Sequence, residues 1–330
     1  MASKNHTRKI ISSSAKLLAT VLIIAFLIRR LGWGTIATTI AGANPLWLAA
    51  GSVVFFVSIW LGSVQWYWLL RNRGLSLPFS RTFKLYFVGM FFNNFIMGGI
   101  VGDAVKVASI RARDGKGKVG FAATFLDRFA GLWALCGFAV VGSIILLSRG
   151  MLTHGRIETA VIALFAAFAL FAGIMLFLIF KPIQIFFFSI TDRFAFFRKL
   201  KIKEIISEML FEAQDYKLLA SVAMLAFLTQ FLRIGSNILI AASLNLVTAE
   251  NFQYFFIFIP IVSMLMTVPL PFGVRETFGG VLFALAGFQP DAAFIMGFLA
   301  SLIAIAISSL GGFFFVTEKM YKSSSKKNGA

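Results

Sequence analysis

The sequence predicts an all-α polytopic membrane protein with about six transmembrane helices and two re-entrant hairpins made of broken helices. Three observations lead to this fold class. Of the 330 residues, 59% are hydrophobic and 13% are charged, whereas roughly a quarter of the residues in a soluble domain are charged. Apolar runs of about 20 residues, long enough to cross a bilayer as a helix, recur along the chain. Two further apolar regions are interrupted by glycine or proline.

The predicted spans are long apolar runs in which charged residues are rare. The first follows a basic stretch and is interpreted as an uncleaved helix, because Arg29, Arg30 and a long gap separate it from the small residues AGA at 41–43. Trp66, Tyr67 and Trp68, which lie beside Arg71, are interpreted as an interfacial aromatic belt. We expect spans at about 10–28, 46–70, 119–147, 157–180, 218–245 and 291–316.

Basic residues indicate how the chain is oriented, since Lys and Arg collect in cytoplasmic loops. Most of them, 24 of 31, fall in the five segments 1–16, 71–84, 106–118, 181–217 and 317–330. These segments share one side only if both termini are cytoplasmic and the interrupted region between the second and third segments enters and leaves on that side. We therefore attribute the net charge of +18 to Lys and Arg in cytoplasmic loops. We expect no nucleic-acid partner.

The first interrupted region, 83–107, is accordingly predicted to be a re-entrant hairpin. An alternative is an ordinary span with a kink, in which Gly98 and Gly102 form a helix-packing face. That alternative would place the loop 106–118, with its five Lys and Arg residues, on the outside.

The second interrupted region, 252–288, mirrors the first from the external side. We therefore predict a single domain over 1–330, with halves 1–147 and 157–316 that each contain one hairpin, and a tail 317–330. One hairpin from each face is typical of an inverted-repeat transporter, whose substrate site lies near the middle of the membrane where broken helices meet.

Several polar side chains fall inside apolar regions, where they are costly. Asp127 and Arg128 lie about eight residues, or roughly 12 Å, into their span. A charged residue at the bilayer centre costs at least ~2.5–3.5 kcal/mol, so such groups indicate mutual pairing or a polar cavity. The others are Asp103 after a glycine break, Gln230, Arg233 and Asn237 at i, i+3 and i+7 of one helix, and Arg275 and Glu276 after PLPFG.

Pairing of Asp127 with Arg233, or of Asp103 with Arg275, is one explanation for these groups. A cavity explains the set better, because residues 103, 275 and 276 all flank helix breaks. A helix that restarts at a break directs free backbone N–H groups and its positive dipole end into such a cavity, and arginine favours phosphate or carboxylate. The sequence therefore predicts a mid-membrane site for an anionic head group.

The sequence contains few residues that could bind a metal ion or act as a catalytic nucleophile. The single cysteine, Cys136, lies in an apolar run, and His6 and His154 fall in a tail and a loop. We expect no disulfide, no metal, no cofactor and no catalytic residue.

Three motifs, NN-F-x-x-G-G-x-x-G-D-x-V-K, F-L-D-R-x-x-G and PLPFGVRE, carry a family resemblance. In this order they resemble the lysylphosphatidylglycerol synthase transmembrane family, the flippase-like domain also found in bifunctional bacterial lysyl-lipid synthases. Met97, Val101 and Lys106 depart from its usual residues, and the third motif lacks the usual double glycine. The resemblance implies site roles for Asn93, Asn94, Gly98, Gly99, Gly102, Asp103, Asp127, Arg128, Gly131, Gly273, Arg275 and Glu276.

The resemblance implies translocation of an anionic phospholipid or a polyprenyl-linked lipid across the cytoplasmic (inner) membrane. Bifunctional members continue into a cytosolic aminoacyl-transferase domain, whereas here the last span is followed only by EKMYKSSSKKNGA, so we expect no synthase activity. Three alternatives stay open: a membrane-embedded transferase acting on a lipid or polyprenyl phosphate, a non-catalytic lipid-path partner of a separate synthase, and a transporter of a small soluble anion.

Overall fold

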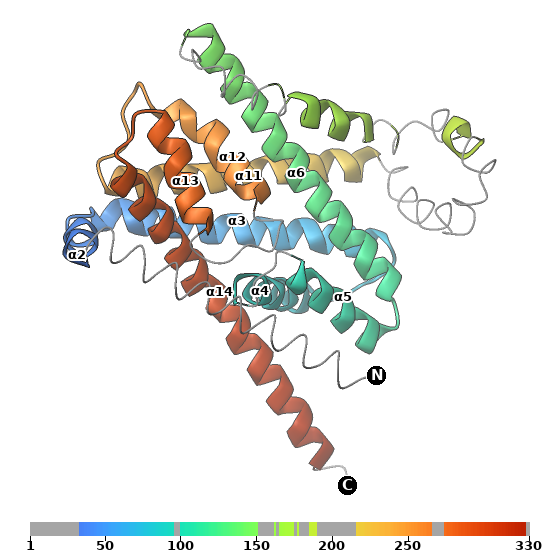
Figure 1. Cartoon of the computed structure of the whole chain (residues 1–330). Helices are drawn as coiled ribbons and strands as arrows, with labels where there is room; N and C mark the ends of the chain where they lie inside the picture. Colours follow the sequence, from blue (N-terminus) through green and yellow to red (C-terminus); the bar gives the residue numbers. More distant parts are fainter. Residues whose placement is uncertain are drawn as a thin grey trace, which may run out of the picture. The chain divides into compact units, whose positions relative to one another are not determined.

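The structure, a computed structural model, describes residues 33–95, 100–150, 162, 165–174, 177, 185–189, 216–265 and 274–327. Every regular element in these residues is a helix (Figure 1). Among the helices of these residues, four are long and apolar enough to cross a membrane. They are α3 (Pro45–Asn72), α6 (Gly117–Ser148), α11 (Tyr216–Ser243) and α14 (Pro290–Lys327).

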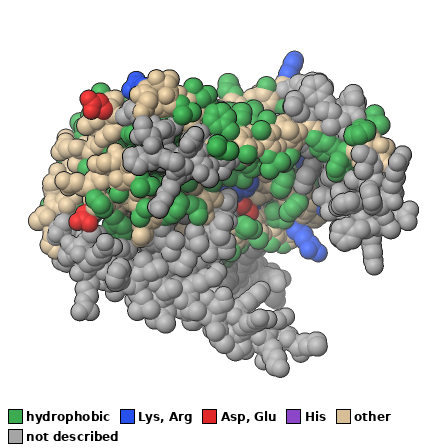
Figure 2. Space-filling model, turned by 45° about the horizontal axis from the view of Figure 1, so that its top comes forward, with side chains coloured by type: hydrophobic (Ala, Val, Ile, Leu, Met, Phe, Trp, Pro, Cys, Tyr) green, Lys and Arg blue, Asp and Glu red, His purple; other side chains and the backbone are tan. Residues whose placement is uncertain are grey.

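These four helices coincide with the spans predicted at 46–70, 119–147, 218–245 and 291–316, and each has the length and composition of a membrane span. The predicted span 10–28 lies outside the described residues, and so does much of 157–180, within which Phe165–Ile174 is a short apolar helix. Large hydrophobic side chains are exposed on each of the four long helices, and they cover much of the described surface in Figure 2. Such a surface suits lipid rather than water, so the chain is an α-helical, multi-pass membrane protein.

The remaining elements are shorter. Helix α2 (Trp33–Ala41) precedes α3 and was not expected from the sequence. The others form the two interrupted regions: α4 (Phe79–Phe95), α5 (Val101–Asp114), the 3₁₀ turn η1 (Phe252–Tyr254), α12 (Phe255–Leu265) and α13 (Val274–Leu285).

Contacts divide the described residues into two compact units. The first unit takes its residues from Met1–Val57, Phe83–Lys106 and Leu232–Ala330, and the second from Ser58–Thr82 and Val107–Phe231. Helices α3 and α11 each contribute one part to each unit.

In the first unit, α4 and the start of α5 run antiparallel. Gly102 lies against both Gly89 and Asn93 of α4, while Lys106, one turn later, lies against Gly89 and Tyr86. Contacts that move backward along α4 as the chain moves forward along α5 require a reversal of direction between the helices. The absence of a side chain at Gly102 allows the two backbones to approach this closely.

Helices α12 and α13 form a second antiparallel pair in the first unit (Figure 1). The Phe283 ring lies 4.8 Å from the Phe255 ring and 5.2 Å from the Phe258 ring, measured between centroids. Gly279, one turn before Phe283, faces Val262, one turn after Phe258. These helices have 11 and 12 residues, fewer than the roughly 17 needed to cross a bilayer.

Helix α14 packs against α4 in the first unit through small residues. Gly311 lies directly on the Phe87 backbone, and Gly312 lies on the Phe91 ring. The predicted site residue Asn94 donates a hydrogen bond from Nδ2 to Ser308 Oγ at 3.0 Å. Small residues and an interhelical hydrogen bond are the usual means of associating helices in lipid, and the Asn94–Ser308 bond is such a contact between α4 and α14.

In the second unit, Trp66 belongs to the core. Its side chain is fully buried, and its Nε1 donates to Thr124 Oγ1 of α6 at 3.1 Å. The interpretation of Trp66 as part of an interfacial belt is therefore wrong. Proximity to Arg71 in the sequence suggested a membrane surface, but helix rotation turns Trp66 toward α6.

Replacing Trp66 with phenylalanine is expected to lower the free energy of unfolding by about 1–3 kcal/mol, since it removes a buried hydrogen bond and leaves part of the indole volume empty. Trp60→Phe in the same helix is the matched control, because Trp60 is 43% exposed and its loss should change the free energy by less than about 0.5 kcal/mol. Unfolding in detergent followed by circular dichroism measures both. Equal losses in the two variants would contradict the core position of Trp66.

Candidate functional site

A buried ion pair lies in the hairpin of α4 and α5. Lys106 Nζ lies 3.0 Å from Asp103 Oδ1, and both residues are at least nine-tenths buried. The same ammonium lies 4.9 Å from the centre of the Tyr86 ring, a cation–π distance. The prediction that grouped Lys106 with the basic loop 106–118 is therefore wrong. Its aliphatic stem fills the space beside Gly89, and Asp103 one turn earlier supplies the countercharge.

The start of α5 already has a side-chain partner. Asn93 Oδ1 accepts a hydrogen bond from the Gly102 backbone N–H at 2.7 Å. At least this one of the N–H groups at the start of α5 is therefore bonded to a side chain. Asp103 lies in the first turn of α5, where the helix dipole favours a negative charge. Gly98 and Gly99 lie outside the described residues.

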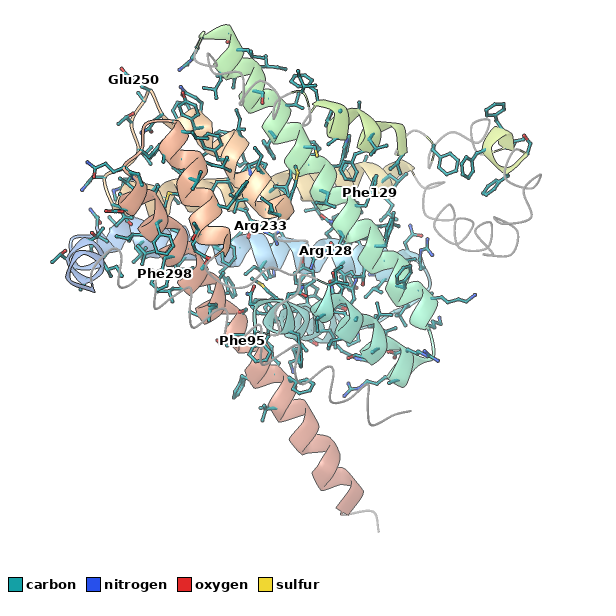
Figure 3. The ribbon with its side chains drawn as sticks, in the orientation of Figure 1. Phe95, Arg128, Phe129, Arg233, Glu250 and Phe298 are labelled. Carbon is teal, nitrogen blue, oxygen red and sulfur yellow. The ribbon has the colours of Figure 1, made fainter. Side chains whose placement is uncertain are left out.

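A second polar cluster lies in the second unit, along α6. Gln65 of α3 donates from Nε2 to Asp127 Oδ1 at 3.0 Å. One turn after Asp127, Gly131 leaves room for Gln230 of α11, whose Nε2 would lie 3.1 Å from a side-chain carbon at position 131. Arg128 projects from α6 and is partly buried (Figure 3). Asp127 therefore has an amide donor 62 residues away in the sequence, which no local pattern indicates.

Helix α11 carries the predicted stripe of Gln230, Arg233 and Asn237. Asn237 Nδ2 donates to the Arg233 carbonyl at 2.8 Å, a bond within one helix. Arg233, labelled in Figure 3, is partly buried, and its Nε is buried without a hydrogen-bond partner among the described residues. A buried guanidinium N–H that lacks a protein acceptor is costly, so this group suits an external acceptor such as a phosphate oxygen.

Glu276 is the most deeply buried of the predicted acids, at 2% exposed. It lies in the first turn of α13, and Ser301 of α14 donates a hydrogen bond to its Oε1. Close packing of α13 on α14 makes this contact possible, since Gly297 faces the Glu276 backbone. Arg275 is the second residue of the same helix, and Gly273 precedes the helix in the sequence; the Arg275 side chain and Gly273 lie outside what the structure describes.

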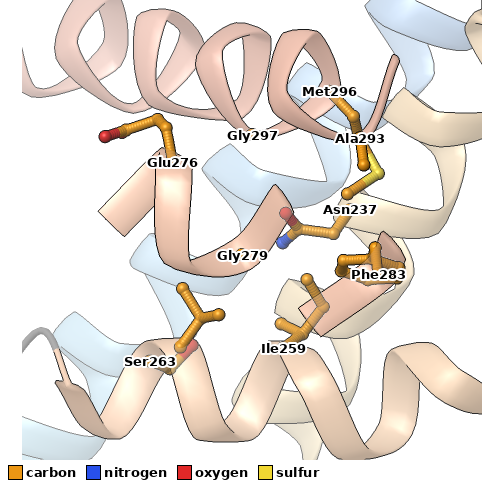
Figure 4. Close-up of a pocket in the computed structure, with 10 residues that line it drawn as sticks. Asn237, Ile259, Ser263, Glu276, Gly279, Phe283, Ala293, Met296 and Gly297 are labelled. Atoms are coloured by element: carbon orange, nitrogen blue, oxygen red, sulfur yellow. The ribbon is translucent and has the colours of Figure 1, made fainter. Parts of the chain in front are cut away.

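Glu276 also borders a cavity of about 30 Å³ within the first unit (Figure 4). Asn237, Ser263 and Glu276 supply its polar lining, from α11, α12 and α13. The other lining residues are apolar or glycine: Ile259, Val262, Gly279, Phe283, Ala293, Met296 and Gly297. In Figure 4 the Asn237 amide points into the space between α12 and α13.

The structure therefore distributes the predicted residues over local clusters within each unit. Sequence reasoning missed Gln65, Lys106 and Ser301 as partners of the buried acids. A signal existed only for Lys106, whose i+3 spacing from Asp103 is the spacing of helical ion pairs. Within the part of the chain that the structure describes, no group of three or more His, Cys, Asp and Glu residues could hold a metal ion.

Comparison with known proteins agrees with a membrane-embedded fold. The family described as the lysylphosphatidylglycerol synthase TM region matches residues 13–312. A curated relative, the UPF0104 membrane protein of Methanothermobacter thermautotrophicus, is 22% identical over 162 residues, which are 49% of this chain. The matched segment spans 45% of that relative, somewhat less than half its length.

Proposed function

The chain belongs to the lysylphosphatidylglycerol synthase TM region family, and we propose that it translocates an anionic phospholipid or lipid-linked molecule across the membrane. The observation that carries this proposal is the set of buried polar side chains on apolar helices, above all Arg233, whose Nε is buried and has no hydrogen-bond partner among the described residues. A lipid head group carrying phosphate needs such groups, because it otherwise meets the desolvation cost of a charge in hydrocarbon.

The two antiparallel helix pairs support a transport function. We propose that α4–α5 and α12–α13 are re-entrant hairpins, cytoplasmic and external respectively, in a cell membrane where both chain termini are cytoplasmic. Helices α12 and α13 are too short to cross a bilayer. Broken helices of this kind are tolerated within a membrane where they are covered by protein or line a cavity, and the cavity beside Glu276 lies between two of them.

Arg233 and Arg275 are the proposed ligands of the head-group anion. Arg233 stands one turn before Asn237, a cavity residue, and Arg275 directly precedes Glu276, which borders the same cavity. In the second unit, Arg128 beside Asp127 on α6 is a separate candidate for binding an anion. The acyl chains would stay in lipid, and a separate lipid-modifying synthase would be a fitting partner because it supplies a modified lipid to move.

Replacing Arg233 with glutamine is expected to slow translocation at least about tenfold. Glutamine keeps hydrogen-bonding capacity but loses the charge, and a hydrogen bond to a charged group is worth about 1.5–3 kcal/mol. The measurement uses purified protein in liposomes with a fluorescent anionic phospholipid, and dithionite quenching reports the leaflet of the probe. Arg71→Gln is the matched control, because Arg71 is exposed in the last turn of α3.

Three results would contradict the proposal. Absence of translocation in folded wild-type protein, with both phospholipid and polyprenyl-phosphate probes, would exclude a translocase of these lipids. Equal rates in Arg233→Gln and Arg71→Gln would exclude Arg233 from the site. Uptake of a small soluble anion by the same liposomes, without lipid movement, would favour a soluble-anion transporter.

A further inference from the structure

The turn between α5 and α6, in the second unit, carries a dense group of basic residues. All of them are exposed: Arg111, Arg113, Lys116 and Lys118. Asp114 is the only acid in residues 111–118, and it accepts hydrogen bonds from Arg81 Nη1 at 3.1 Å and from Arg81 Nη2 at 2.8 Å. Because Asp114 already has a bidentate partner, the exposed side of this basic turn (residues 111–118) is strongly positive.

The basic turn lies at the ends of two long helices. Helix α6 begins at Gly117 and α3 ends at Asn72, and both helices are long enough to cross a membrane. Lys116 Nζ donates a hydrogen bond to the Gly74 carbonyl at 2.7 Å, so these two helix ends lie side by side. Lys116 does not cap α6 with its side chain, and the positive end of the α6 dipole adds to the basic side chains. The ends of membrane spans lie at the level of the lipid head groups, whose phosphates are complementary in charge to this turn.

A row of stacked phenylalanines runs from the basic turn along α6. The ring centroids of Phe121 and Phe125 are 6.5 Å apart with 26° between the ring planes, and those of Phe125 and Phe129 are 6.3 Å apart with 18°. Phe121 and Phe125 are 52% and 41% exposed. Phe129, labelled in Figure 3, is buried, and the centre of the Phe171 ring lies 5.3 Å from its own. This phenylalanine ladder (Phe121, Phe125 and Phe129) is thus open near the basic turn and covered at its far end.

The basic turn and the phenylalanine ladder share one face of α6. Lys118 and the three rings are spaced at i, i+3, i+7 and i+11, which places them along the same side of the helix. The ladder extends over about 12 Å at 1.5 Å per residue, close to the roughly 15 Å of hydrocarbon in one leaflet of a bilayer. This length fits the chain of a phospholipid, which stays within one leaflet, better than the longer chain of a polyprenyl phosphate.

We propose that the second unit binds one anionic phospholipid, with its phosphate on the basic turn and one acyl chain along the phenylalanine ladder. Lys118 lies on the ladder face, and the Arg111 side chain lies against Gly117 at the start of the same helix. Phosphatidylglycerol has a net negative charge, whereas the choline of phosphatidylcholine balances its phosphate, so the site should favour phosphatidylglycerol. The first unit alone lines the cavity beside Glu276, and the inference does not rest on the proposed function.

A tryptophan placed in the ladder reports the bound chain. In liposomes, a phospholipid brominated on its acyl chains quenches the fluorescence that Phe125→Trp adds to the wild type when a chain lies against the new indole. Met224→Trp is the matched reporter, because Met224 is 63% exposed on α11 in the same unit. It follows the exposed Lys217 by seven residues, the spacing that separates Phe125 from Lys118.

The two reporters should differ in their preference for brominated phosphatidylglycerol over brominated phosphatidylcholine. Each basic residue at the level of the head groups contributes about fivefold. The basic turn should therefore give a preference of at least about tenfold at Phe125→Trp, and the single Lys217 at most about fivefold at Met224→Trp. Equal quenching of Phe125→Trp by the two lipids would overturn the inference, and so would the same preference at both reporters.

Removal of single charges tests the position of the phosphate. In the Phe125→Trp background, Lys118→Gln should lower the preference for phosphatidylglycerol about fivefold, and Lys217→Gln, the matched control, should leave it unchanged. High salt should reduce the preference as well, because it screens exposed charges. Equal effects of the two lysine variants would overturn the assignment of the phosphate to the basic turn. Displacement of the brominated phosphatidylglycerol by less polyprenyl phosphate than unlabelled phosphatidylglycerol would overturn the choice of a phospholipid.

Discussion

Replacing Gly102 with alanine is expected to destabilise the protein by at least about 3 kcal/mol. A side-chain carbon at this position would overlap the Gly89 carbonyl oxygen, which belongs to the α4 backbone. It would also lie 2.8 Å from Cγ, the side-chain amide carbon, of Asn93. The Asn93 side chain is itself held by its bond from the Gly102 N–H. Overpacking costs about 1–3 kcal/mol when side chains can adjust and more when backbone must move. The two helices would have to separate.

Gly235→Ala is the matched control for this experiment. A side-chain carbon at Gly235 meets nothing within 4 Å, and alanine is favoured over glycine within a helix by up to about 1 kcal/mol. The fraction of monodisperse protein after extraction and its melting temperature in detergent compare the two variants. If Gly102→Ala and Gly235→Ala melt together, α4 and α5 are not packed as closely as described.

The features that the sequence predicted well are those set by length and local composition. An apolar run of about 20 residues has few structures open to it in lipid, because every backbone group must bond within the segment. The four long helices therefore lie close to their predicted bounds. Glycine and proline likewise interrupt helices for local reasons, but the breaks predicted at Gly98, Gly99 and PLPFG lie outside the described residues.

The partners of the buried polar groups could not be predicted in the same way. Ser301 reaches Glu276 across 25 positions, and Gln65 reaches Asp127 across 62. Such pairs depend on how each helix is rotated about its axis, and an almost uniformly apolar helix has no amphipathic pattern that would fix this rotation. Residues whose type indicates an anion site can therefore also form contacts between helices. Asn93 of α4, for example, accepts the Gly102 N–H at the start of α5.

The buried pair of Asp103 and Lys106 gives the second large expected effect. Removing one partner of a buried ion pair typically costs about 3–5 kcal/mol, because the other charge stays buried without compensation. Asp103→Asn should cost more than Lys106→Met. The first removes the carboxylate that faces the buried ammonium beside the Tyr86 ring, whereas the second leaves a carboxylate that the positive end of the α5 dipole still stabilises.

The double variant, Asp103→Asn with Lys106→Met, separates packing from function. With both charges gone, neither member of the pair is left facing an uncharged partner, so the loss of unfolding free energy should be well below the sum of the two single losses. Additive losses, measured by unfolding in detergent, would show that the two charges do not compensate each other. If the stable double variant still translocates lipid, the pair serves only to hold the hairpin together. Loss of translocation in that folded variant would place the pair among the groups that the lipid anion meets, with Lys106 exchanging Asp103 for phosphate.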